Sequence, residues 1–138
     1  MSAGDQLFAY VLACGDPKIR SRILWELDQR LGPENHFWLP ELGGAKDLIM
    51  PEKDRDRERL LRKMETAAKV HRFGLIILIN HSDCGAYRLS GHTFTDPQEE
   101  ERFHVEQLKK AAEVVREKFP RVAVERHYFL KAEQRMAW

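Results

Sequence analysis

Two short runs of apolar residues constrain the fold of this chain more than any other feature. They are LFAYVLAC, residues 7–14, and LIILIN, residues 75–80. Both runs are nearly continuous and do not alternate with polar residues, so neither fits a strand with one face in water. Strands that are covered on both faces occur mainly in parallel sheets. The two runs therefore predict buried strands of a parallel sheet with helices on both sides.

Segments with helical periodicity lie between the predicted strands. The clearest begins with Asp16 and Pro17, an N-cap residue followed by proline, and its apolar residues recur every four positions. It ends at Gly32, a residue that commonly follows the last turn of a helix. Two further helices are predicted at about residues 54–72 and 98–119.

Two weaker strands complete the predicted order of elements. Residues 36–42 form one of them, although Pro40 interrupts it, and residues 121–129 form the other. Strands that alternate with helices and right-handed crossovers predict an α/β fold: three α/β/α layers around a mostly parallel central sheet of about four strands. The length fits one domain over residues 1–138, and residues 129–138 are expected to dock or fray.

Composition excludes several classes of protein. Lys plus Arg number 23 and Asp plus Glu number 22, a balance that argues against a basic nucleic-acid platform. Apolar runs stay well below the roughly 20 residues that span a bilayer. The first ten residues, MSAGDQLFAY, lack the basic and apolar regions of a secretory signal. We therefore expect a cytoplasmic protein with no membrane or nucleic-acid partner.

Side chains that suit a metal follow the two apolar runs. Cys14 and Asp16 come at the end of the first run, and His81 and Cys84 come at the end of the second. Ligands in open parallel sheets sit beyond the carboxyl ends of the strands. If the two strands are neighbours, two thiols, one imidazole and one carboxylate meet in one crevice. Sulfur, nitrogen and oxygen donors of this kind suit zinc.

These motifs resemble those of the β-class carbonic anhydrases. CGD after one strand and HSDCGA after another are similar to the family's Cys-x-Asp-x-Arg and His-x-x-Cys motifs, in the same order. WLPELGGAKDL, residues 38–48, resembles its glycine-rich segment, and the likeness covers roughly residues 7–130. The resemblance implies a β-carbonic-anhydrase-like fold with Zn²⁺ held by Cys14, His81 and Cys84.

The resemblance also assigns a role to Asp16. In the family this carboxylate either orients the zinc-bound water or becomes a fourth ligand, and the motif arginine pairs with it. That position is Lys18 here, and lysine cannot form the planar two-bond pair with a carboxylate. Arg20, four residues from Asp16 on the predicted helix, is a second candidate for the partner.

The implied activity is reversible hydration of carbon dioxide to bicarbonate by zinc-bound hydroxide, in a homodimer or a higher homo-oligomer. Two alternatives share the ligand set. One is a non-catalytic protein with a structural zinc that Asp16 closes, and the other is a zinc hydrolase of a related small molecule such as carbon disulfide or carbonyl sulfide. A nucleotide-binding module fits poorly, because CGDPKIR lacks the glycine spacing of a phosphate loop.

Simpler interpretations of the same residues stay open. Cys14 and Cys84 can be buried thiols or form a disulfide, and Asp16 can be only a helix N-cap. The remaining polar and glycine residues near the motifs have structural explanations too, with two histidines as candidate proton shuttles. These residues are Asp83 as a turn residue, Gly43 and Gly44 as a tight turn or, as the less favoured alternative, a close approach of backbone to the site, and His92 and His104 as the two histidines.

Overall fold

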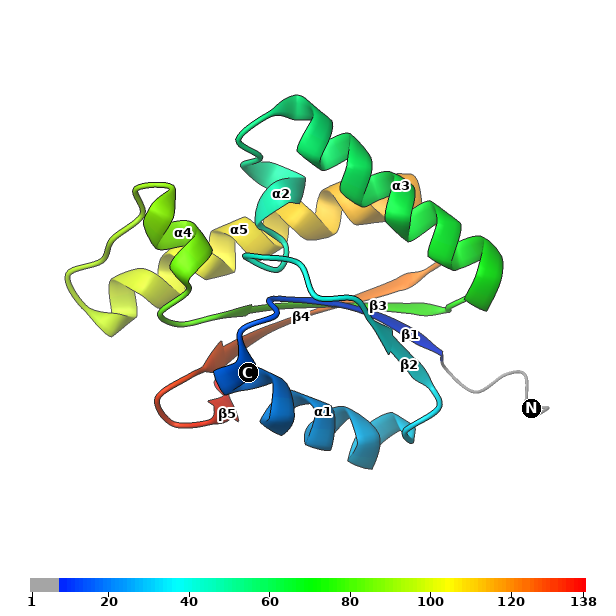
Figure 1. Ribbon diagram of the computed structural model, residues 1–138, viewed down its shortest axis with the longest axis horizontal. Helices are drawn as coiled ribbons and strands as arrows, with labels where there is room; N and C mark the ends of the chain where they lie inside the picture. The colour runs from blue at the N-terminus through cyan, green and yellow to red at the C-terminus, as the bar shows by residue number, and fades with distance from the viewer. Residues whose placement is uncertain (1–7) are drawn as a thin grey trace.

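A central sheet of five strands organises the molecule in the computed structural model, which describes residues 8–138 (Figure 1). Leu7, the first residue of a predicted strand, and most of the segment assessed for a secretory signal lie outside the described residues. The strands are β1 (Ala9–Ala13), β2 (His36–Trp38), β3 (Leu75–His81), β4 (Ala123–Leu130) and β5 (Arg135–Met136).

The strands run in the order β2-β1-β3-β4-β5 across the sheet. β1 through β4 pair in parallel, and β5 pairs antiparallel to β4. The predicted parallel sheet is therefore confirmed, with a fifth strand beyond the four expected. That strand comes from the tail, which docks because Ala137 donates a backbone hydrogen bond to Tyr128 (2.7 Å).

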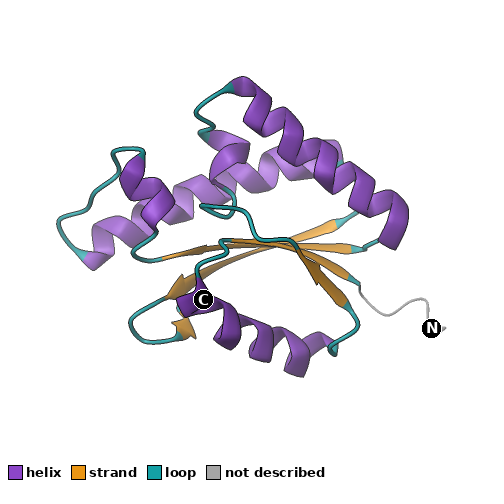
Figure 2. Ribbon diagram, viewed as in Figure 1, coloured by secondary structure: helices purple, strands orange, loops and turns teal. Residues whose placement is uncertain are grey.

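Helices cover both faces of the sheet (Figure 2). One face carries α1 alone, and the other carries α2, α3 and α5, so the three-layer prediction is confirmed (Figure 1). The short α4 lies beyond the end of β3. The helices are α1 (Pro17–Leu31), α2 (Lys46–Ile49), α3 (Asp54–His71), α4 (Gly85–Leu89) and α5 (Pro97–Lys118).

The side chains of β1 alternate between two hydrophobic clusters. Val11 packs with the α1 side chains Ile19 and Ile23, and Tyr10 and Leu12 pack with residues of α3 and α5. Every residue of β1 and of β3 is buried. Because both faces of these strands are covered, their sequences are continuous apolar runs.

The second predicted strand is shorter than expected. Residues 36–42 were predicted as strand, but β2 ends at Trp38, before Pro40, which has no amide hydrogen for a sheet. The chain stays beside the end of β1, because Trp38 Nε1 donates to the Ala13 carbonyl (3.1 Å) and so does the Glu41 amide (3.2 Å).

The three long helices lie within one residue of their predicted bounds, while the short α2 and α4 were not predicted. No helix in the described part of the chain is both long and apolar enough to cross a membrane.

Candidate metal centre

The carboxyl ends of β1 and β3 bring the two sequence motifs together. Ala13 pairs with Ile79 in the parallel register of these neighbouring strands, so Cys14 follows β1 close to where His81 ends β3. Cys84 occupies the N-cap position of α4, three residues further on. The adjacency of strands that the sequence argument required is thus present, at the edge where parallel sheets place their ligands.

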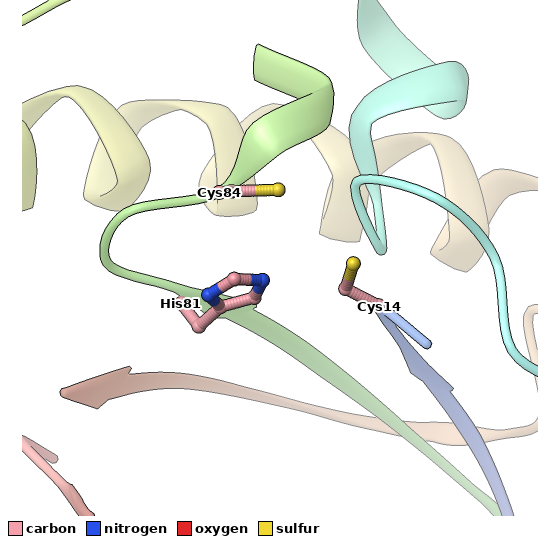
Figure 3. Close-up of side chains that lie close together, drawn as sticks. All are labelled: Cys14, His81 and Cys84. Carbon is pink, nitrogen blue, oxygen red and sulfur yellow. The ribbon is translucent and has the colours of Figure 1, made fainter. Parts of the chain in front are cut away.

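Three donor atoms converge at this edge (Figure 3). One ligand atom each from Cys14, His81 and Cys84 lies within 4.8 Å of the other two, a grouping that could hold a metal ion. All three residues are buried, at 5%, 1% and 5% exposure. Both cysteines are free thiols, so the disulfide considered from the sequence is not formed.

The imidazole of His81 is oriented by the backbone carbonyl of the next residue, Ser82. Nδ1 lies 2.6 Å from the Ser82 carbonyl oxygen, and a carbonyl only accepts, so Nδ1 donates the hydrogen. In the neutral ring Nε2 then carries a free lone pair. Nε2 is buried and has no hydrogen-bond partner among residues 8–138. A histidine that donates one nitrogen to a carbonyl and leaves the other free is arranged as metal ligands are.

The two thiols perturb each other. The hydrogen bond from Cys84 lowers the pKa of Cys14 against the opposing effect of burial, and His81 lowers that pKa further. The same bond and burial raise the pKa of Cys84. The opposite directions of these two shifts make Cys14 the more acidic thiol of the pair. Thiolate is the form of cysteine that binds metals.

The turn between His81 and Cys84 depends on Asp83. Its φ of 52° lies in the left-handed region, which aspartate tolerates better than most residues. Its amide donates to Glu100 Oε2 (2.9 Å), and its carboxylate accepts from Arg88 Nη1 (2.6 Å). Asp83 is thus the turn residue that the sequence predicted, and its conformation lets His81 and Cys84 face one point.

The Gly43–Gly44 segment packs against both strand ends. Gly44 has φ +61°, and a Cβ atom there would lie 2.8 Å from the Ile79 carbonyl and 3.4 Å from the Cys14 amide. Gly44 also closes a turn by donating to the Glu41 carbonyl (2.9 Å). The segment is therefore a turn, as expected, and also a close approach of backbone to the candidate site.

Sequence reasoning missed Asn80, a polar residue at the end of an otherwise apolar run. Its Oδ1 accepts from the Ala45 amide (3.3 Å), and its Nδ2 lies 3.1 Å from the Tyr87 hydroxyl and 3.0 Å from His104 Nδ1. Burial, with the charges of His81 and His92, lowers the pKa of His104 to about 3. His104 is therefore a neutral, buried member of this network, which joins the glycine turn, α4 and α5.

Asp16 caps α1 and also forms an ion pair beside the cluster. Its Oδ1 accepts from the Lys18 amide (2.8 Å), and its Oδ2 lies 2.7 Å from Lys131 Nζ. Burial raises the pKa of Asp16, but the hydrogen bonds from Lys131 and Lys18 outweigh it and lower the pKa below its usual value. Lys131 follows β4, and no sequence motif singled it out.

Neither side chain considered as a partner of Asp16, Lys18 or Arg20, forms an ion pair with its carboxylate in the described part of the chain. Lys18 has an exposed side chain and contributes only its amide to the cap. The guanidinium of Arg20 lies over the Trp38 ring, 4.7 Å from its centroid. Within residues 8–138 the only ion pair of the Asp16 carboxylate is with Lys131.

The fold and the clustered donors define a three-layer α/β protein with a candidate Cys–His–Cys metal centre. Residues 4–136 match a family model described as "Putative carbonic anhydrase". The chain belongs to this family of carbonic anhydrase-like proteins.

Solved structures share the fold. The chain is similar to the apo form of carbon disulfide hydrolase, with a TM-score of 0.58 and 19% identity, over 95% of this chain and 77% of that one. It is also similar to tetrameric β-carbonic anhydrases from Sordaria macrospora, with a TM-score of 0.52 and 14% identity, over 95% and 79% of the chains. The fold is thus that of the β-carbonic anhydrases.

Two curated relatives are uncharacterized proteins from Rickettsia bellii and Rickettsia conorii. Each is 29% identical over 102 residues, which is 72% of this chain. The chain spans 62% and 55% of the length of these two relatives.

Proposed function

We propose that this protein is a zinc-dependent carbonic anhydrase-like enzyme that converts carbon dioxide reversibly to bicarbonate. The observation that carries the proposal is the buried convergence of Cys14, His81 and Cys84 within 4.8 Å, with His81 Nε2 left without a hydrogen-bond partner among residues 8–138. A buried polar atom without a hydrogen bond is costly, and a bound cation is one way to satisfy it. Membership of the carbonic anhydrase-like family points the same way.

The donor set fits zinc in particular. Two sulfurs and one nitrogen match the ligands of catalytic zinc sites, which use three protein ligands and keep a fourth position for water or substrate. Cys14, His81 and Cys84 would hold the ion. The chemistry that zinc supplies in such a site is the activation of water as a nucleophile at neutral pH.

A cavity beside Cys84 gives a small molecule room to approach the cluster. Its volume is about 390 Å³, and its walls combine the aromatic side chains Tyr87 and Phe94 with the charged side chains Arg88 and Glu100. Asp16, kept ionised by its two hydrogen bonds, is an acceptor that can orient a reacting water. We assign Asp16 this orienting role.

The proposal is tested by measuring metal content and carbon dioxide hydration on one preparation. We expect about one zinc per chain in the wild type and hydration well above the buffer rate. Cys84→Ser replaces a thiolate by a poor zinc ligand, and we expect it to lose the metal and the hydration together. His81→Gln and His71→Gln form a matched pair, because His71 lies outside the cluster, where it stacks on Phe8 and makes a tilted contact with Phe37. We expect only His81→Gln to lose the metal.

Each of the other possible outcomes would favour a different function for the protein. Zinc that binds without any hydration would favour the structural zinc site. Hydrolysis of carbon disulfide without carbon dioxide hydration would favour the hydrolase alternative. Failure of the wild type to bind zinc or cobalt would leave Cys14 and Cys84 as buried thiols and refute the proposal.

We further propose that the protein assembles as a homodimer or a higher homo-oligomer. Large apolar side chains are exposed on several elements: Trp25 at 52%, Leu42 at 78%, Val70 at 68% and Leu89 at 90%. A solved relative of the same fold is described as tetrameric. Light scattering coupled to gel filtration measures the mass directly, and a monomer at micromolar concentration would contradict this part of the proposal.

A further inference from the structure

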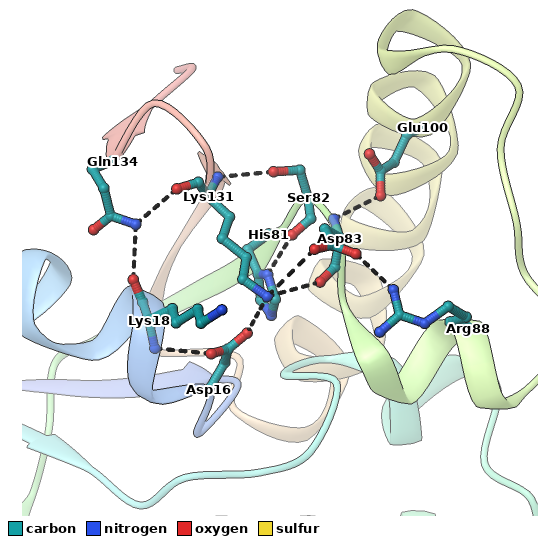
Figure 4. Close-up of polar contacts among 9 residues, drawn as sticks. All are labelled: Asp16, Lys18, His81, Ser82, Asp83, Arg88, Glu100, Lys131 and Gln134. Atoms are coloured by element: carbon teal, nitrogen blue, oxygen red, sulfur yellow. Dashed lines mark hydrogen bonds and ion pairs between the residues drawn. The ribbon is translucent and has the colours of Figure 1, made fainter.

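A cluster of polar contacts joins the turn after β4 to both segments that carry the candidate ligands (Figure 4). At its centre Lys131 Nζ lies 2.7 Å from Asp16 Oδ2 and 3.3 Å from the Asp83 carbonyl oxygen. Asp16 follows Cys14 by two residues, and Asp83 lies between His81 and Cys84. One ammonium group therefore bridges the ends of β1 and β3.

The turn that presents Lys131 is itself fixed. The Lys131 amide donates to Ser82 Oγ (2.8 Å), which ties the turn to the β3 end. Gln134 Nε2 donates to the Lys18 carbonyl (2.8 Å) and to the Lys131 carbonyl (2.7 Å), which ties the turn to the start of α1. The Lys131 side chain is only 18% exposed, so it is held more firmly than an ordinary surface lysine.

These contacts engage both oxygens of Asp16, and each oxygen keeps a second lone pair. Oδ1 accepts from the Lys18 amide and Oδ2 pairs with Lys131 Nζ. Removal of the ammonium would leave Oδ2 without its ionic partner, in a carboxylate two residues after the candidate ligand Cys14. Oxygen is an accepted zinc ligand, so an unrestrained carboxylate can fill a fourth position.

We propose that Lys131 is a positioning residue, which restrains Asp16 and so keeps a fourth coordination position of the Cys14–His81–Cys84 centre open. This inference rests on the proposed function, because it concerns a metal bound by those three residues. The role belongs to Lys131 rather than to Lys18 or Arg20, which form no ion pair with Asp16 in the described chain. Outer residues of this kind typically change metal-site behaviour by about 10- to 100-fold when they are mutated.

The test uses the full chain loaded with Co²⁺, whose visible spectrum reports its ligands, and azide as the probe of an open position. We expect azide to change the wild-type spectrum. Lys131→Met keeps the length of the side chain but removes its charge, so we expect azide to leave that spectrum largely unchanged. Lys131→Arg keeps the charge and should restore the response. Lys118→Met is the matched control, since Lys118 pairs with Glu65 at 2.8 Å, away from the site.

Carbon dioxide hydration is measured on the same zinc-loaded variants. We expect kcat/KM to fall about 10-fold or more in Lys131→Met and to recover in Lys131→Arg, with Lys118→Met near the wild type. Since Lys131 acts through Asp16, its replacement should have little further effect in an Asp16→Asn background. If Lys131→Met does not fold, Lys131→Gln asks the same question with a neutral polar side chain.

The outcomes separate this inference from the proposed function. An azide response and a hydration rate in Lys131→Met equal to the wild type would overturn the role of Lys131 and leave the enzyme assignment standing. Effects of Lys131→Met and Asp16→Asn that simply add would also overturn it, because they would show that the two residues act independently. A wild type that binds neither Co²⁺ nor zinc would overturn both proposals.

Discussion

The candidate centre has two halves that are built in different ways. The sulfur and imidazole half consists of Cys14, His81 and Cys84, all at most 5% exposed, at the ends of two central strands. The carboxylate half consists of Asp16 and Lys131, with side chains 17% and 18% exposed, between a helix start and a turn. The first half is set by strand pairing, and the second by the ion pairs that Lys131 forms across the fold with Asp16 and with Asp83.

This difference indicates how well each half tolerates substitution. Cys14 and His81 cannot move apart unless β1 and β3 separate, and those strands are buried along their whole length. Asp16 depends on a turn 115 residues away in sequence, as the spacing of Asp16 and Lys131 shows. We therefore expect changes in the first half to affect both metal binding and stability. Changes in the second half that keep the N-cap of α1, such as Asp16→Asn, should affect chemistry with little loss of stability.

The largest effect should come from removal of the metal. A ligand that binds only the native state adds about 4 kcal/mol when its concentration is 1,000 times its Kd. Chelation should therefore lower the Tm of the wild type by about 10 °C or more, as measured by calorimetry. Cys84→Ser should melt at the same temperature with and without chelator. A wild-type Tm that does not respond to chelation would show that the sulfur half holds no metal.

The next largest effect is expected in the Gly43–Gly44 segment, which packs on the ends of β1 and β3. Gly44→Ala would place a Cβ 2.8 Å from the Ile79 carbonyl at φ +61°. Left-handed strain and overpacking together should destabilise the fold by about 2–4 kcal/mol, as measured by urea unfolding. The zinc affinity should fall as well, because the clashing atoms belong to Ile79 and Asn80, the two residues before His81 (2.8 Å and 3.1 Å).

Gly91→Ala is the matched control for this change. Gly91 also has a positive φ, +91°, but a Cβ there meets nothing within 4 Å. Only the backbone strain applies, so we expect a loss of about 1 kcal/mol and unchanged metal affinity. Equal losses in the two variants would mean that the close approach at Gly44 contributes nothing to the site.

The difference between the two halves of the centre also explains which features the sequence could predict. Continuous apolar runs specify β1 and β3, and donors placed right after them specify the sulfur and imidazole half, because both signals are local. The sequence also predicted Asp16 as an N-cap and Asp83 as a turn residue, which the structure bears out. These features depend on a few neighbouring residues and on the geometry of parallel strands.

The missed features depend on contacts between distant segments. Lys131 is one of many lysines in sequence, and only the turn after β4 brings it to Asp16. β5 has two residues and no pattern of its own, and β2 ends early because of Pro40. Asn80 did carry a signal, since it is the polar residue at the end of the apolar run LIILIN. Its partners Ala45 and Tyr87 could not be inferred locally.

The smallest effect concerns a second ion pair that joins α1 to β4. Arg30, in the last turn of α1, donates to Glu125 on β4, with Nη1 2.7 Å from Oε1 and a second bond from Nη2. Lys131 and Asp16 form the equivalent link at the start of the same helix. The two links allow an ion pair away from the site to be compared with one beside it.

The pH dependence of the Arg30 link follows from Glu125. The Arg30 hydrogen bond outweighs burial and lowers the pKa of Glu125 to about 2. A carboxyl whose pKa is lower in the folded state adds stability above its unfolded pKa of about 4.3, and this stability is lost as the pH falls toward 2. Both side chains are substantially exposed, at 45% and 31%, so we expect only about 0.5–1 kcal/mol.

Glu125→Gln tests the predicted loss of stability with falling pH directly. Its unfolding free energy in urea should lie about 0.5–1 kcal/mol below the wild type at pH 7, and the difference should vanish near pH 2. Glu113→Gln, an exposed residue of α5, should show no such trend. Metal content should be unchanged in both variants, because Glu125 lies outside the donor cluster. A Glu125→Gln variant that lost its metal would contradict the view that only the link at Asp16 belongs to the centre.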